Sequence, residues 1–167
     1  MTPELLIHPE RISSKPIVFE GSVAIDELPR LEESLANRDL ELRFRVVAQL
    51  DKTRRKVVSC IIEGFVFLTC QSTLEAFRHA ISIDDRLVLV DDESALPPIE
   101  EESDAEDYLV VDGPLAVLDL VEDAVLLSLP MVPRKPGLEA AAGAGKPEKP
   151  PGASPFAALA GLKKRPQ

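Results

Sequence analysis

The chain has 167 residues and a formal net charge of −10, with 45% hydrophobic and 4% aromatic residues. Its length suits a single domain with tails and a largely aliphatic core. No apolar run approaches the roughly 20 residues of a membrane-spanning helix, so a membrane protein is not expected. Two cysteines cannot build the disulfide framework of a small secreted protein. We therefore expect a cytoplasmic protein.

Residues 1–16 are expected to form an irregular lead-in, because three prolines interrupt them and no hydrophobic period is sustained. They also lack the continuous apolar stretch of a signal peptide. A short strand at residues 17–19 is expected to end near Gly21. Asp26 is the expected N-cap of a helix. The apolar face of this helix consists of Leu28, Leu31 and Leu35.

The next segments have the pattern of strands. Apolar and polar residues alternate over residues 40–48, which predicts a half-buried strand, and residues 51–55 form a polar turn. Residues 56–70 are apolar at both odd and even positions. This predicts a central strand that is covered on both faces, with a bulge or bend at Gly64.

Two shorter strands are predicted next, at residues 77–83 and 87–90, with a tight turn between them at Asp84 and Asp85. Residues 91–107 contain nine acidic residues and no basic one. We expect a solvated loop there, because so charged a segment has little apolar surface to bury.

The longest helical pattern follows a short strand at residues 109–111. Asp112 is its expected N-cap, Pro114 fits its first turn and Pro130 ends it. Acidic side chains occupy the side opposite to an apolar stripe. The stripe consists of Leu115, Leu118, Val121, Val125, Leu126 and Leu129.

After this helix the chain becomes rich in Ala, Gly, Pro and Lys, which indicates a flexible linker. Residues 134–167 hold seven basic and two acidic residues, a balance of +5, which leaves −15 for residues 1–133. A field of that sign repels phosphate, so local basic groups must make any contact with nucleic acid. A short helix is expected over residues 153–164, displaying Phe156, Leu159 and Leu162.

Two motifs resemble the YceD family, the large ribosomal RNA subunit accumulation proteins of bacteria and plastids. The first is the acidic helix DLVED with the following LLSLPMVP, residues 119–133, and the second is SPFAALAGLKKR, residues 154–165. The resemblance implies a role in the accumulation of large-subunit rRNA. We expect a non-enzymatic factor that binds precursor rRNA, or an early assembly protein, transiently.

Many YceD-like proteins carry Cys-x-x-Cys where this chain reads CQST at residues 70–73, so a hydroxyl replaces the second thiolate. Structural zinc takes four N or S ligands, and the chain does not supply them nearby. Cys60 is ten residues away on the same strand, too far to share an ion at about 3.3 Å per residue. We expect no metal or cofactor, and no catalytic set around His8 or His79.

Basic residues are the RNA-binding candidates. We expect six of them to form one patch at the end of a hairpin, where they would track phosphates. The alternative is a solvated face that keeps a sheet edge soluble. The patch consists of Arg43, Arg45, Lys52, Arg54, Arg55 and Lys56, and the C-terminal motif adds Lys163, Lys164 and Arg165.

Acidic and apolar residues are the candidates for contact with a basic protein, such as a ribosomal or assembly protein. Such a partner gives an alternative function, an adaptor or chaperone that shields a basic ribosomal protein without touching RNA. A metal-dependent nuclease that uses the acidic residues is a further alternative. The partner-binding candidates are Asp119, Glu122, Asp123, Phe156, Leu159 and Leu162.

Together the segments predict an α+β fold, with an antiparallel sheet that can curl into a partial barrel, about two helices and a flexible C-terminal tail. The expected parts are the lead-in (1–16), an α+β domain resembling YceD (17–133, with the acidic loop at 91–107) and a linker with the basic motif (134–167). The sequence does not determine the oligomeric state.

Overall fold

The computed structural model describes residues 5–98 and 105–137. The chain divides into two units, Met1–Arg134 and Lys135–Gln167. All the helices and strands given below belong to the first unit. Most of the predicted linker and the whole basic C-terminal motif lie outside the described residues.

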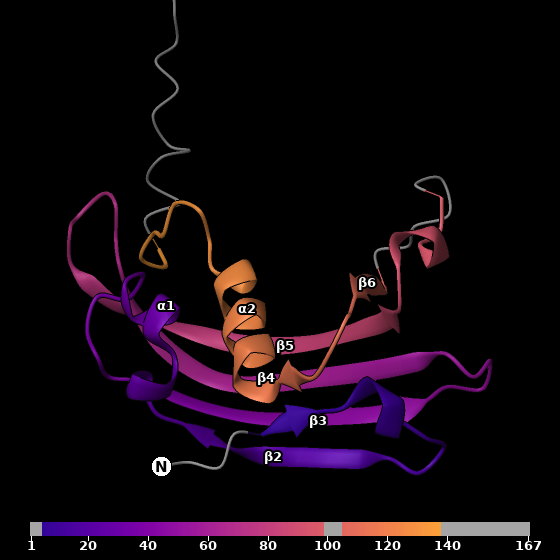
Figure 1. Cartoon of the computed structure of the whole chain (residues 1–167). Helices are drawn as coiled ribbons and strands as arrows, with labels where there is room; N and C mark the ends of the chain where they lie inside the picture. Colours follow the sequence, from indigo (N-terminus) through magenta and orange to yellow (C-terminus); the bar gives the residue numbers. More distant parts are fainter. Residues whose placement is uncertain (1–4, 99–104, 138–167) are drawn as a thin grey trace, which may run out of the picture. The chain divides into compact units, whose positions relative to one another are not determined.

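The main sheet has five strands in the order β2-β3-β4-β5-β6 (Figure 1). The strands β2 to β5 are antiparallel neighbours, whereas β6 pairs parallel with β5. Within the described residues the sheet is open, with β2 and β6 at its edges, so the α+β class is confirmed and no barrel closes. The bounds are β2 Ile17–Val23, β3 Glu41–Leu50, β4 Lys56–Thr69, β5 Ala76–Val90 and β6 Asp107–Val110.

The N-terminal segment, expected to be irregular, contributes to the fold. Strand β1 (Leu6–Ile7) pairs antiparallel with β7 (Leu115–Ala116), and the 3-10 helix η1 (Pro9–Arg11) follows it. Ile7 and Ile12 are buried. Isolated apolar residues among prolines produce no periodic signal, which is why the sequence pattern does not reveal this packing.

A 3-10 helix η2 (Ile25–Glu27) and a short helix α1 (Pro29–Glu32) replace the single helix expected after Asp26. Pro29 lacks the N–H that would continue η2 and instead occupies the start of α1. The expected N-cap is wrong, because the carboxylate of Glu27 accepts a hydrogen bond from Ala24 N at 2.9 Å. A third 3-10 helix, η3 (Glu93–Ala95), lies in the acidic segment.

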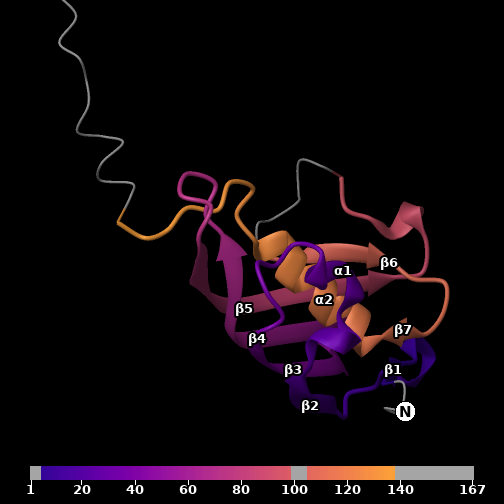
Figure 2. The same cartoon turned by 90° about the vertical axis from the view of Figure 1, so that its left-hand side faces the viewer.

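Helix α2 (Val117–Ser128) lies across one face of the sheet, over β4 and β5 (Figures 1 and 2). It starts later than predicted, because residues 115–116 pair with β1, so its N-cap is Ala116 and not Asp112. Its buried apolar side therefore differs from the expected stripe, although Val121 and Val125 belong to both. The buried apolar side consists of Val117, Leu120, Val121 and Val125.

The face of the sheet beneath α2 is the core, and the opposite face is open. Complete burial of a Val, Leu or Ile side chain contributes about 1.5–3 kcal/mol, so this one face supplies much of the stability. The expectation that β4 is covered on both faces is wrong for most of the strand, because Ile61 on the other face is 39% exposed, although Val57 near the start of the strand is buried. The core residues of β3 and β4 include Leu42, Phe44, Val46, Ala48, Val58, Cys60, Ile62, Val66 and Leu68.

Strand β5 is continuous over 15 residues, so the predicted tight turn within it is wrong. Asp84 and Asp85 pair in register with Ile61 and Cys60 of β4. The long partner strand thus outweighs the local turn preference of two aspartates. Gly64 marks no bulge, since the β3–β4 register continues on both sides of it.

Candidate functional site

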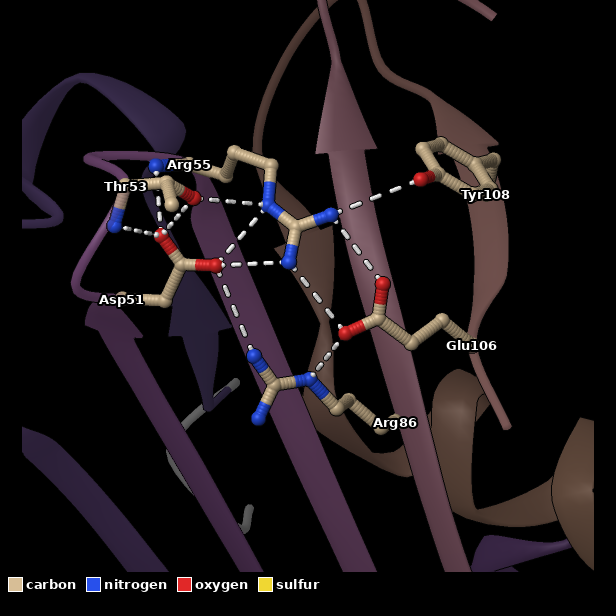
Figure 3. A network of polar contacts seen from close by, with 6 residues as sticks. All are labelled: Asp51, Thr53, Arg55, Arg86, Glu106 and Tyr108. Carbon is tan, nitrogen blue, oxygen red and sulfur yellow. Dashed lines mark hydrogen bonds and ion pairs between the residues drawn. The ribbon is translucent and has the colours of Figure 1, made fainter. Parts of the chain in front are cut away.

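The turn between β3 and β4 is held by the side chain of Asp51 (Figure 3). Its Oδ1 accepts hydrogen bonds from Thr53 N (2.8 Å), Thr53 Oγ1 (2.7 Å) and Arg55 N (3.0 Å). Partial burial alone would raise the pKa of Asp51, but the hydrogen bonds from Thr53 and Arg55 outweigh it and hold the pKa well below its usual range. The turn also places Arg54 in the left-handed region, at φ 64°.

Arg55 is enclosed by acidic groups in the network of Figure 3. Its Nε donates to Asp51 Oδ2 at 2.8 Å and its Nη1 to Glu106 Oε2 at 3.0 Å. Arg86 closes a four-membered ring of alternating charge, with its Nε 2.8 Å from Glu106 Oε1 and its Nη2 3.5 Å from Asp51 Oδ2. Glu106 and then Asp51 raise the pKa of Arg55. The four charges cancel within the ring.

This arrangement divides the predicted basic patch. Arg55 lies in the ring, and Lys56 donates to Asp91 Oδ1 at 2.8 Å. Lys52 and Arg54 remain exposed and have no ion pair within the described part of the chain. Arg45 lies about 17 Å of strand before the end of β3 at Leu50, and Lys52 lies beyond that end in the turn. The expectation of one patch at the hairpin end is therefore wrong, and its residues fall into a turn group and a strand group.

The strand group lies on the open face of the sheet. Arg45 stands opposite Ile61 of β4, and Arg43 stands opposite Glu63. The Arg43 side chain is 76% exposed, and its Nη2 donates to Glu41 Oε1 at 3.0 Å. An exposed pair of this kind contributes little stability and opens at little cost.

Two aromatic rings and a third arginine share this face. The rings of Phe65 and Phe67 meet edge to face, with their centroids 5.9 Å apart. The guanidinium carbon of Arg78 lies 4.0 Å from the centroid of Phe65, a cation–π contact. Sequence reasoning assigned both rings to a buried face. The polar residues Ser59 and Glu63 at the same parity are the signal that this face is open.

The open face is close to balanced in charge, although residues 1–133 together carry −15. Arg86 is neutralised within the ring, and the register places the other three arginines among four carboxylates across β2 to β5, a net charge of −1. This face therefore repels phosphate less than the rest of the first unit does. The charged residues of the face are Arg43, Arg45, Arg78, Arg86, Glu20, Glu41, Glu63 and Asp84.

The acidic helix residues have different roles. Glu122, expected on the solvent side, is only 3% exposed, and its carboxylate accepts hydrogen bonds from Arg30 N, Arg30 Nε and Leu31 N at 2.7, 2.7 and 2.9 Å. Asp123 pairs with Arg30 Nη1 at 2.6 Å. Glu122 and then Asp123 raise the pKa of Arg30. Of the three predicted partner-binding acids, Asp119 is exposed and has no ion pair within the described residues.

A small groove runs between α2 and the strands β5 and β6. Its volume is about 160 Å³, and its lining is mostly apolar. Asp85, Asp107 and Asp123 contribute carboxylates to it. Burial, then Asp107 and Asp84, raise the pKa of Asp85, and no cation of the described residues pairs with Asp85 or Asp107.

Both cysteines are buried. Burial and then Asp85 raise the pKa of the Cys60 thiol to about 11, so it stays protonated at neutral pH. In the described ranges, no group of three or more His, Cys, Asp or Glu side chains is arranged to hold a metal ion. No helix there is long and apolar enough to span a bilayer.

The C-terminal candidates lie outside the described residues. They are Phe156, Leu159, Leu162, Lys163, Lys164 and Arg165.

Comparison with known proteins identifies one family. The model of a family described as "Large ribosomal RNA subunit accumulation protein YceD" matches residues 58–163. This range contains the acidic helix, Phe65, Phe67 and Arg78, but starts after Arg43, Arg45 and the turn. No solved structure matches the chain significantly. Because the match covers more than half of the sequence, the chain belongs to the YceD family of large ribosomal RNA subunit accumulation proteins.

Proposed function

We propose that this protein promotes the accumulation of large-subunit rRNA without catalysis, by binding precursor rRNA transiently on the open face of its sheet. The family assignment supports the link to this RNA. The observation that carries the proposal is the stack of Arg78 on Phe65, 4.0 Å from guanidinium carbon to ring centroid, on an exposed face. Guanidinium planes and aromatic rings are the groups on which unpaired bases stack.

Arginines beside the rings supply the phosphate contacts. Arg45 and Arg78 have no ion pair within the described residues, and Arg43 has only its exposed pair with Glu41. Because the face has no excess of positive charge, these few contacts give modest affinity. Modest affinity suits a factor that must leave the assembling subunit.

The test is binding of the purified protein to a single-stranded fragment of large-subunit rRNA over a series of salt concentrations. The face variant replaces Arg43, Arg45 and Arg78 by Gln. The control variant removes the same charge elsewhere, through Arg11→Gln, Lys15→Gln and Arg134→Gln, which are exposed residues outside the strands of the sheet. Each phosphate contact contributes about 0.7 to the slope of log K against log salt, so the face variant should lose a slope of about 2.

The control variant should change the slope much less than the face variant. Equal losses in the two variants would show that only net charge matters and would remove the open face from the proposal. Absence of binding by the unmodified protein at low salt would overturn direct contact with RNA.

A second candidate function is an adaptor for a basic protein, and the groove beside α2 favours it. Its carboxylates at Asp85 and Asp107 lack cationic partners among the described residues, and apolar side chains surround them. A basic segment with an apolar side chain fits such a groove. If this function is the main one, Asp85→Asn with Asp107→Asn should abolish capture of a basic ribosomal protein, and the face variant should retain it.

A further inference from the structure

A cavity of about 400 Å³ lies at the turn end of the sheet. The turn, the end of β5, η3 and β6 surround it. Its walls are largely apolar, and its volume falls in the range of ordinary small-molecule sites. The apolar residues of the lining are Val88, Leu89, Val90, Ala95, Pro97 and Tyr108.

One side of this cavity is fixed by the ring of charges in Figure 3. Arg55 lines the cavity, and its guanidinium is held by Asp51 and Glu106. Arg55 Nη1 lies 3.4 Å from the hydroxyl oxygen of Tyr108, so the aromatic ring is placed beside a group that does not move freely. Side chains that are already held in place before a ligand binds lose less conformational entropy on binding.

The cavity also has an available positive charge. Arg55 is neutralised by Asp51 and Glu106, and Lys56 by Asp91 at 2.8 Å. Arg54, which also lines the cavity, is exposed, and its side chain makes no hydrogen bond or ion pair with any described residue. Its backbone has a φ of 64°, a conformation that Gly adopts at lower cost. A cationic side chain is thus present where the backbone alone would favour glycine.

We propose that this cavity binds one unpaired nucleotide of the RNA, with the base against Tyr108 and the apolar wall and the adjacent phosphate on Arg54. The ligand must offer a flat, largely apolar group next to a single negative charge. An unpaired nucleotide has both, whereas a paired base is held inside its duplex. The inference rests on the proposed RNA binding and adds the site at which a base leaves the strand.

The experiment compares three RNA probes by fluorescence anisotropy: a 12-residue oligouridylate, a strand of the same length with abasic positions throughout, and the oligouridylate paired with its complement. Two variants alter the cavity, Arg54→Gly and Tyr108→Leu. Lys52→Gly is the matched control, because Lys52 is an exposed cation of the same turn that does not line the cavity. Arg54→Gly suits the left-handed backbone, so its fold should be retained, as checked by its melting temperature.

The unmodified protein should bind oligouridylate at least fivefold more tightly than the abasic strand or the duplex. Arg54→Gly and Tyr108→Leu should each weaken oligouridylate binding at least fivefold, and Lys52→Gly less than twofold. If oligouridylate binds but the cavity variants match the unmodified protein, the nucleotide site is overturned and the proposed function stands. If the unmodified protein binds none of the probes, the proposed function is overturned together with the site.

Discussion

Single residues join parts of this fold that are distant in sequence, and Glu122 is the clearest case. Its buried carboxylate accepts hydrogen bonds from the N–H groups of Arg30 and Leu31 at the start of α1. These N–H groups have no acceptor within their own helix. A charged residue that looks like part of a solvated helix side in the sequence therefore fastens α1 to α2.

We expect Glu122→Gln to lower the free energy of unfolding by about 1–3 kcal/mol. The buried NH₂ group of the glutamine would face the Nε–H of Arg30, and neither of these two donors would find an acceptor in the other. Asp119→Asn is the matched control on the exposed side of the same helix, and it should stay within about 0.5 kcal/mol. Urea unfolding measures both. Equal stabilities of the two variants would contradict the structural role of Glu122.

The raised pKa of Asp85 predicts a pH dependence of the folding stability. Its folded pKa is raised, so between its usual value and that raised value the folded chain keeps a proton that the unfolded chain releases. Stability attributable to Asp85 therefore falls as the pH rises through this window. We expect Asp85→Asn to melt at a higher temperature than the unmodified protein at pH 7 and to lose the difference near pH 3.

Asp51 and Asp92 have lowered pKa values, so their contributions disappear only as the pH falls below the usual range of Asp. Melting curves from pH 3 to pH 7 thus separate the two effects. A melting temperature of Asp85→Asn below that of the unmodified protein at pH 7 would contradict the prediction.

At the scale of whole elements, the long antiparallel strands could be predicted where one face is polar. The alternation in β3 gave its buried residues correctly, from Leu42 to Ala48. In β4 the open face carries Ile61, Phe65 and Phe67, so its hydrophobicity imitates that of a strand buried on both sides. Apolar rings on an open face mislead a rule that equates apolar residues with the core.

The predicted helix boundaries were wrong for a different reason. The start of α2 depends on residues 115–116 pairing with β1, which is more than 100 residues away in the sequence. The local signals of Asp112 and Pro114 carry no information about that pairing. Because the helix starts later than predicted, its buried side also differs from the predicted one. Glu122, predicted on the solvent side, lies in the core.

The contact between β3 and β4 gives a prediction at this scale. A Cβ on Gly64 would lie 1.8 Å from the carbonyl oxygen of Glu41, and the φ of Gly64 is +148°. Gly64→Ala should therefore force the strands apart and cost at least about 3 kcal/mol of stability.

Gly113→Ala is the control, because nothing lies within 4 Å of the added Cβ. We expect it to change stability by less than about 0.5 kcal/mol. Urea unfolding at constant temperature compares the two variants. A Gly64→Ala variant as stable as Gly113→Ala would show that β3 and β4 do not approach as closely as described.

At the scale of the whole molecule, charge separates the two proposed functions. Residues 1–133 carry −15 and residues 134–167 carry +5, so the molecule has acidic and basic parts suited to opposite partners. The basic candidates Lys163, Lys164 and Arg165 were predicted from composition and the resemblance alone. The ring around Arg55 could not be predicted in this way, because it joins the β3–β4 turn, strand β5 and the residue before β6.

Replacing Lys163, Lys164 and Arg165 by Gln tests which partner the basic part serves. If these residues contact phosphate, RNA affinity should fall and the slope of log K against log salt should shrink by about 2, since each contact contributes about 0.7. Combining them with the face variant should give nearly additive losses in binding free energy, because separate contacts contribute independently. Capture of a basic ribosomal protein should be retained, since removing positive charge does not weaken attraction to a cation. The opposite result, unchanged RNA binding with weakened protein capture, would assign the C-terminal motif to a protein partner.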